Sequence, residues 1–181
     1  MTARVANNEI RYKMLNRRGL ILAGLSMAIP TRLDAAAMIA DWEGETLVLA
    51  PGAARAILRL SGTMTVANLA AQAQTRRIIL RLGGIAANRD PETGYFVFLN
   101  AGDDVKPTAD DLGYAGALSF FGMPKDVSEG SRAVSFEVSP VLVRLQQAGR
   151  LNGPLSVTIL PATPPAGGSR PSIAEIALYA N

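Results

Sequence analysis

Short apolar runs, separated by clusters of glycine, proline, asparagine and aspartate, occupy most of the chain after residue 45. In residues 133–138, Val134, Phe136 and Val138 alternate with small or polar side chains, and residues 155–160 repeat the pattern. Alternation with a period of two places one face of a strand on the core and the other in water. The pattern predicts an all-β fold, a single antiparallel β-sandwich that is jelly-roll-like and carries one short helix. The predicted strands are 46–50, 54–60, 76–83, 94–100, 115–121, 133–138, 155–160 and 172–179.

Residues 94–100 (GYFVFLN) are apolar on both faces. A strand with two apolar faces needs cover on each side, so we expect a central strand or one beneath a partner. Residues 161–171 (PATPPAGGSRP) are rich in proline and glycine. That composition predicts a long hairpin loop before the last strand.

The one clear helix follows the strand at 133–138. Ser139 is a plausible N-cap, Pro140 suits the first helical position, and Gly149 stands where a C-terminal cap belongs. Val141 and Leu145 recur at helical spacing and would face the sheet. Residues 67–74 are either a second, weaker helix or a loop crossing.

Residues 1–37 have the three parts of an export signal: a polar basic stretch, an apolar run and a group of small residues. The apolar run, Leu20 to Pro30, is about eleven residues long, whereas a helix that spans a bilayer needs roughly twenty. Arg17 and Arg18 directly before this run resemble a twin-arginine signal. We therefore expect residues 1–37 to be an export signal and residues 38–181 a single domain. The alternative is an amphipathic N-terminal helix of a cytoplasmic protein with a chance Arg-Arg pair.

This interpretation places the protein in the periplasm or outside the cell, tethered to the membrane if the signal is not cleaved. No stable transmembrane span is expected. The chain has 18 Lys and Arg residues against 15 Asp and Glu, but six of the basic residues and two of the acidic ones precede residue 38. The remainder carries a net charge of −1. No basic face for nucleic acid is therefore expected on the domain.

The chain contains no histidine and no cysteine. These residues supply the usual ligands of zinc and copper, the base of a Ser-His-Asp triad and the sulfurs of disulfides. Carboxylate, lysine or tyrosine chemistry remains, and we find no constellation of such residues that indicates an active site. The sequence predicts no catalytic residue, no metal ligand and no cofactor bound by this chain.

Two aromatic features are candidate partner contacts: Phe120 and Phe121 with the following Met123, and Trp42. Adjacent residues on a strand point to opposite faces, so one phenylalanine should enter the core while the other faces outward. An outward ring beside methionine would suit a hydrophobic groove of a partner. The alternatives are that a second layer covers both rings, and that Trp42 either plugs a pocket or caps the edge of the sandwich.

Two groups of charged residues are expected to lie in solvent rather than to form a site. One loop holds four aspartates but lacks the spacing of a calcium-binding loop, so we expect a solvated loop rather than a metal site. A set of three arginines is expected to form a solvated strand face that could still pair with an acidic partner. These residues are Asp103, Asp104, Asp110 and Asp111 in the loop, and Arg76, Arg77 and Arg81 on the strand.

From Arg76 to the end, the order of segments resembles the C-terminal β-sandwich of tyrosinases and polyphenol oxidases, the region named for a KFDV motif in plant enzymes. At the place of that motif this chain has GYFV (94–97), with neither lysine nor aspartate. The matching segments are RRIILRLGGI (76–85), YFVFLN (95–100), YAGALSFF (114–121), FEVS (136–139), LSVTILP (155–161) and IAEIALY (173–179).

In that family the sandwich follows a helical domain that holds two copper ions through six histidines, and it can cover the entrance to the active site. The resemblance therefore implies a non-catalytic accessory subunit of a separate tyrosinase-like di-copper oxidase. Such a subunit would act as a lid, chaperone or export escort, with the copper in the partner. Two alternatives stay open: a stand-alone exported sandwich that binds a ligand such as carbohydrate, and an enzyme that uses carboxylates or tyrosine.

Overall fold

The structure is a computed structural model that describes residues 36–49, 51–122 and 132–181. Three of the predicted functional residues, Arg17, Arg18 and Met123, lie outside the described residues. No helix in the described ranges is long and apolar enough to cross a membrane.

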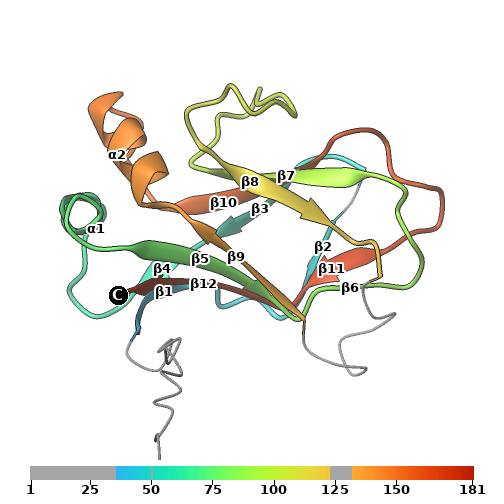
Figure 1. The fold of residues 1–181 in the computed structure, drawn as a ribbon, viewed down its shortest axis with the longest axis horizontal. Coiled ribbons are helices and arrows are strands. Elements are labelled where there is room, and N and C mark those ends of the chain that lie inside the picture. Colours follow the sequence, from blue (N-terminus) through green and yellow to red (C-terminus); the bar gives the residue numbers. More distant parts are fainter. Residues whose placement is uncertain (1–35, 50, 123–131) are drawn as a thin grey trace, which may run out of the picture. The chain divides into compact units, whose positions relative to one another are not determined.

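Two antiparallel sheets form the body of the domain (Figure 1). The larger sheet has five strands in the order β4-β1-β12-β5-β9, and every neighbouring pair is antiparallel. Its central strand, β12, pairs over its whole length with β5, from Glu175 opposite Gly83 to Ala180 opposite Ile78. The strands of this sheet are β1 (Ala37–Asp41), β4 (Arg59–Leu60), β5 (Ile78–Gly83), β9 (Ala133–Glu137) and β12 (Glu175–Ala180).

The second sheet has four strands in the order β3-β10-β7-β8. The strand that is apolar on both faces, β7, lies between β10 and β8, which confirms its predicted central position. A small sheet in the order β2-β11-β6 completes the fold. The strands are β3 (Ala54–Ile57), β7 (Gly94–Leu99), β8 (Tyr114–Ser119) and β10 (Ser156–Pro161) in the second sheet, and β2 (Leu47–Val48), β6 (Ala86–Ala87) and β11 (Pro171–Ile173) in the small one.

The core lies between the two main sheets and follows the predicted alternation. On β5, Ile78, Leu80 and Leu82 are fully buried, whereas the intervening Ile79 is only partly covered. Alternate residues of the four-stranded sheet belong to the same buried cluster, among them Val97 on β7 and, on β10, Val157 and Ile159. Burial of such side chains from both sheets is the main source of stability in a sandwich. The predicted fold class, an all-β antiparallel sandwich, is confirmed.

Two short helices lie near each other at one end of the sandwich (Figure 1). The sequence predicts one of them clearly and leaves the other open between helix and loop. Helix α1 (Val66–Gln72) begins after Thr65, whose side-chain oxygen accepts a 3.1 Å hydrogen bond from the backbone N–H of Asn68. Its buried residues are Leu69 and Ala70. Helix α2 (Ser139–Gln147) buries Val141, Leu142 and Leu145. The segment predicted at 67–74 is thus a helix that begins at Val66 and ends at Gln72, two residues before the predicted end.

The predicted N-cap at Ser139 is wrong. Val138 occupies the N-cap position without a side-chain hydrogen bond, and Ser139 is already helical. The Ser139 hydroxyl instead accepts a 2.7 Å bond from the backbone N–H of Ile78 and donates a 3.2 Å bond to the Arg76 carbonyl oxygen. The side chain therefore ties α2 to the start of β5.

The predicted hairpin at residues 161–171 is also wrong. The strands on either side, β10 and β11, belong to different sheets, so this segment crosses between sheets. Two predicted strands are each divided, 54–60 into β3 and β4, and 172–179 into β11 and β12. The sequence does not predict strands β1 and β6. The expected boundary between export signal and domain, after residue 37, falls just after the first residue of β1.

Candidate functional site

The turn after β8 presents one aromatic ring to the core and the other to solvent. Phe120 is 3% exposed, and its ring meets that of Tyr95 edge to face with centroids 5.3 Å apart. Phe121 is 83% exposed, more than any other large hydrophobic side chain in the described part of the chain. The alternation expected of adjacent aromatic residues is therefore observed. Phe120 belongs to the core, which leaves Phe121 as the ring of this pair that is accessible to a partner.

Trp42 is partly buried and packs against the core cluster. Its backbone N–H donates a 2.9 Å hydrogen bond to the Ile176 carbonyl oxygen, which joins it to β12. The indole ring lies over Gly44, where a Cβ atom would come within 2.0 Å of the ring. This packing agrees with the second of the two interpretations, a ring that caps the edge of the sandwich.

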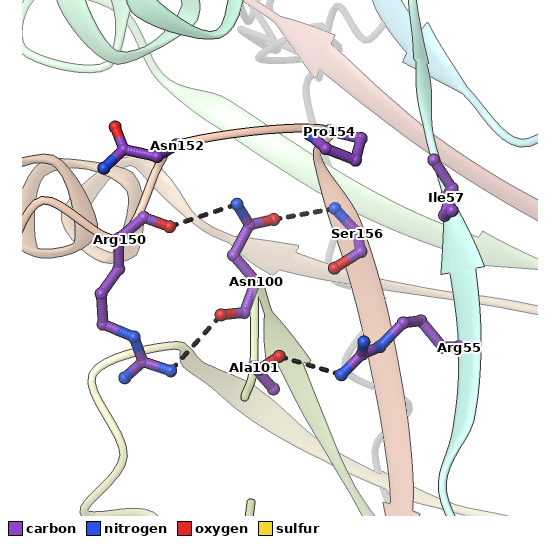
Figure 2. A pocket seen from close by; sticks show the side chains of 8 residues that line it. All are labelled: Arg55, Ile57, Asn100, Ala101, Arg150, Asn152, Pro154 and Ser156. Atoms are coloured by element: carbon purple, nitrogen blue, oxygen red, sulfur yellow. Dashed lines mark hydrogen bonds between the residues drawn. The ribbon is translucent and has the colours of Figure 1, made fainter. Parts of the chain in front are cut away.

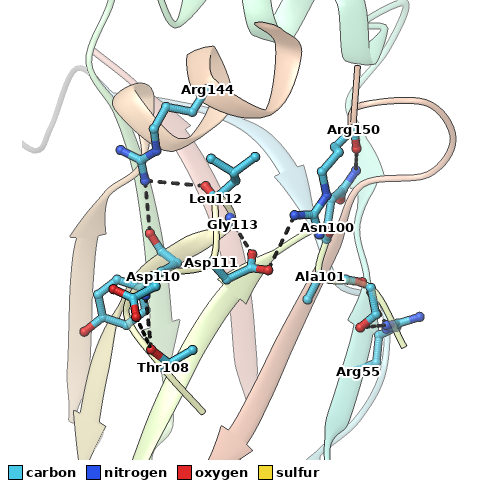
Figure 3. A network of polar contacts seen from close by, with 12 residues as sticks. Arg55, Asn100, Ala101, Thr108, Asp110, Asp111, Leu112, Gly113, Arg144 and Arg150 are labelled. Carbon is cyan, nitrogen blue, oxygen red and sulfur yellow. Dashed lines mark hydrogen bonds and ion pairs between the residues drawn. The ribbon is translucent and has the colours of Figure 1, made fainter. Parts of the chain in front are cut away.

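Three of the four aspartates between β7 and β8 have different partners, and Figure 3 shows those of Asp110 and Asp111. The Asp103 carboxylate pairs with Arg55 at 2.9 Å, and its side chain is 95% exposed. Asp110 accepts a 3.0 Å bond from the Thr108 hydroxyl. Asp111 accepts a 2.7 Å bond from the backbone N–H of Gly113 and lies 3.4 Å from an Arg150 nitrogen.

Arginines from α2 and the segment after it hold the two ends of this acidic loop (Figure 3). Arg144 donates to the carbonyl oxygens of Leu112 and Tyr114, at 3.5 and 3.4 Å. Arg150 donates to the Asn100 carbonyl oxygen at 3.4 Å. Within the described residues, no group of three or more Asp, Glu, His or Cys side chains lies close enough together to hold a metal ion.

The three arginines predicted on one strand face have different environments. Arg81 pairs with Glu175, whose hydrogen bond raises the pKa of the guanidinium. Arg77 pairs with Glu137 at 2.8 Å, and Arg76 is exposed. Two of the three thus have carboxylate partners within the same sheet.

Sequence reasoning missed a set of polar residues that the fold brings together: Arg55 from β3, Asn100 at the end of β7, and Arg150 after α2. They lie far apart in the sequence and share no motif. One local signal was available, because asparagine directly after a strand is favoured where the backbone takes a positive φ, and Asn100 has a φ of 43°.

Comparison with known proteins gives one family match and several similar structures. No curated protein matches the chain. A latent aurone synthase (polyphenol oxidase) from a natural source is similar at 19% identity and a TM-score of 0.47, over 74% of this chain and 25% of the enzyme. A latent apple tyrosinase is similar at 16% identity and a TM-score of 0.49, over 75% of this chain and 27% of the enzyme.

The chain thus spans about a quarter of the length of these two enzymes. The family match covers more than half of the chain, residues 45–181, and includes every described strand except β1. The chain belongs to the family described as a domain of unknown function, DUF7868.

Proposed function

We propose that this chain is a non-catalytic accessory subunit of a separate, tyrosinase-like di-copper oxidase. Two features of the sequence support the proposal: the ordered segments that resemble the C-terminal sandwich of that family, and the lack of any histidine with which to bind copper. On this proposal the partner performs the oxidation, and the sandwich covers or stabilises the face that leads to its copper ions.

The observation that carries the proposal is the exposed ring of Phe121. The four other exposed large hydrophobic side chains in the described ranges are between 41% and 58% exposed, against 83% for Phe121. The neighbouring Phe120 is fixed in the core against Tyr95, so the backbone that carries Phe121 is anchored. An anchored backbone reduces the conformational freedom that is lost on binding, and aromatic rings are over-represented among the residues that dominate interface energies.

The mechanism is steric. An aromatic side chain seated in an apolar pocket of the partner would be desolvated together with that pocket, and the sheet behind it would exclude phenolic substrate. The same contact would shield the partner's apolar surface before copper is loaded. Because the predicted leader is a twin-arginine type, which carries folded cargo, a partner without its own signal could be exported in complex with this chain.

Copurification tests the proposal. The full chain with a C-terminal affinity tag is expressed in its native host, and bound proteins are identified by mass spectrometry and assayed for copper and phenol oxidation. We expect a histidine-rich copper oxidase to copurify with the wild type. Phe121→Ser should weaken its binding by about 2 kcal/mol, close to thirtyfold.

Ile57→Ser is the matched control, because Ile57 is also exposed, at 58%, but lies on β3 and away from the turn after β8. It should bind the oxidase as the wild type does. The proposal fails if the wild type recovers no copper oxidase, or if Phe121→Ser and Ile57→Ser bind it equally well. Copper bound by the isolated chain, with turnover of a phenol, would also contradict it.

A further inference from the structure

A polar hollow of about 230 Å³ opens where β3, the end of β7 and the start of β10 meet the segment after α2 (Figure 2). Two of the eight described residues that line it are arginines, and none of the eight is acidic. Each arginine also has an aspartate partner outside the lining, Asp103 for Arg55 and Asp111 for Arg150. The lining residues are Arg55, Ile57, Asn100, Ala101, Arg150, Asn152, Pro154 and Ser156.

Arg55 is held mainly by neutral groups. Its Nε donates to the Thr158 hydroxyl at 3.3 Å, and Nη2 donates to the Ala101 carbonyl oxygen at 3.0 Å. Its one carboxylate partner among the described residues is Asp103, at 2.9 Å, and the Asp103 side chain is 95% exposed. An ion pair so open to water is screened and contributes little. The guanidinium is therefore fixed in place by neutral groups, and its carboxylate partner is free to exchange with water and ions.

Arg150, on the opposite side of Asn100, has spare hydrogen-bonding capacity (Figure 2). A guanidinium has five N–H donors. In the described part of the chain Arg150 makes two side-chain contacts, both at 3.4 Å, to the Asn100 carbonyl oxygen and to Asp111. These contacts are long for charge-assisted hydrogen bonds, which are usually near 2.8 Å.

The backbone between the two arginines is rigidly held. Asn100 has a positive φ of 43°, an uncommon conformation that persists when the surroundings fix it. Its side-chain oxygen accepts a 2.8 Å bond from the backbone N–H of Ser156, and its side-chain nitrogen donates to the Arg150 carbonyl oxygen at 3.4 Å. The position of Asn100 between the two arginines is therefore fixed by hydrogen bonds to β10 and to the segment after α2.

We propose that this hollow binds a small anion through carboxylate or phosphate oxygens, with Arg55 and Arg150 as its charged ligands. Ser156 and Asn152 also line the hollow, and the Asn152 amide nitrogen donates to the Gly149 carbonyl oxygen at 2.7 Å. The volume is below the roughly 300–1,000 Å³ of sites for drug-sized ligands, which favours a compact ligand. The two arginines favour an anion with more than one charge. This inference goes beyond the proposed function, because it requires no oxidase partner.

Binding is tested on the full chain with citrate and inorganic phosphate as probes, at constant ionic strength maintained with chloride. We expect saturable binding by calorimetry, with a Kd in the millimolar range or tighter, and a rise in Tm that chloride does not produce. Arg150→Gln and Arg55→Gln should each weaken binding about tenfold or more, because each removes charge-assisted hydrogen bonds. Arg150→Lys should weaken it less, since it keeps the charge but loses the planar fork.

Arg144→Gln is the matched control. Arg144 donates to loop carbonyls in the same network but does not line the hollow, so this variant changes the net charge equally and should bind as the wild type does. If Arg144→Gln and Arg150→Gln lose affinity equally, the attraction is non-specific and the proposal is overturned.

Chemical shifts of the wild-type chain provide a second test, which does not depend on whether a variant folds. In the ¹⁵N spectrum of the wild-type full chain, citrate should shift the side-chain signals of Asn100, Asn152 and Arg150 before others. Shifts confined to other residues, or no saturable binding by either probe, would overturn the proposal.

Discussion

At the scale of single residues, Tyr95 is the least satisfied polar side chain of the core. It is fully buried on β7, and its hydroxyl has no hydrogen-bond partner in the described residues. A buried hydroxyl without a partner costs free energy because it has lost its bonds to water. We expect Tyr95→Phe to raise the free energy of unfolding by about 1 kcal/mol at pH 7, measured by urea denaturation. A variant less stable than the wild type would show that the hydroxyl has a partner.

The same residue predicts a dependence on alkaline pH. Burial raises the pKa of Tyr95 above its ordinary value of 10.0. Below pH 10 the folded and unfolded states both carry the neutral phenol. Above it the unfolded chain ionises first, so the unfolded state is favoured and stability falls as the pH rises toward the pKa of the folded protein.

The stability advantage of Tyr95→Phe over the wild type should therefore grow between pH 10 and 11.5, because phenylalanine cannot ionise. Urea denaturation of both proteins across this range measures the difference. The difference between the two proteins below pH 10, where the phenol is neutral in both the folded and the unfolded state, is the reference for this comparison. A constant difference between Tyr95→Phe and the wild type would contradict the prediction.

At the scale of elements, Ser139 joins helix α2 to strand β5 rather than capping the helix. We expect Ser139→Ala to lower the free energy of unfolding by about 1–3 kcal/mol, because it leaves the Ile78 N–H buried without its acceptor. Helical content should stay unchanged by circular dichroism, since the N-cap is Val138.

Ser135→Ala on β9 is the control for this variant. Ser135 is exposed, so its replacement should change stability by less than about 0.5 kcal/mol. If Ser139→Ala lost helical signal by circular dichroism but not stability, Ser139 would act as a cap of α2 after all.

The elements that can be predicted from the sequence are those whose apolar and polar residues alternate over a short stretch of chain. Strands β9 and β10 are predicted within one residue at each end, because their apolar side chains alternate with small or polar ones. The predicted solvent face of β10 is wrong, however, because Ser156 and Thr158 are buried as well, at 9% and 0% exposure. Strand β1 was missed, since its short run follows the predicted leader directly. The Ser139 role was missed because serine before proline is also a common helix start, and only the fold brings Ile78 to it.

Contacts between distant segments were not predictable in this way. Residues 161–171 have the composition of a hairpin loop. However, β10 and β11, the strands on either side, pair with strands of two different sheets, and this pairing depends on how the whole chain packs. The polar hollow combines Arg55, Asn100 and Arg150 only in the folded chain. Gly113 gives a similar example: a Cβ atom there would lie 2.2 Å from the Leu99 carbonyl oxygen, a constraint that no local pattern reveals.

At the scale of the whole molecule, the first and last strands of the described body are paired. Strand β1 lies between β4 and β12, with Ala37 opposite Ala180. Its residues Ile39 and Ala40 are 6% and 0% exposed and belong to the core cluster. The larger sheet is therefore complete only when segments near both ends of the domain have come together, and contacts at such sequence separation form as part of a cooperative transition.

This arrangement makes the N-terminal boundary of the domain testable. The family match begins at residue 45 and so excludes β1, whereas the predicted leader ends at residue 37 and leaves Ile39 and Ala40 in the sheet. A chain without residues 1–37 should unfold at nearly the same temperature as the full chain. Removal of residues 1–44 takes away the buried Ile39 and β1, one of the two strands that pair with β12, a loss of about 3 kcal/mol or more.

For a domain of this size such a loss lowers Tm by roughly 10 °C, which differential scanning calorimetry resolves easily. It also exposes one edge of β12, so the shorter chain should aggregate at concentrations at which the longer one is monomeric by light scattering. Equal Tm values for the two truncated chains would mean that β1 adds nothing to the fold. In that event the stable sandwich would begin at the family boundary, and the seven residues 38–44 would lie outside it.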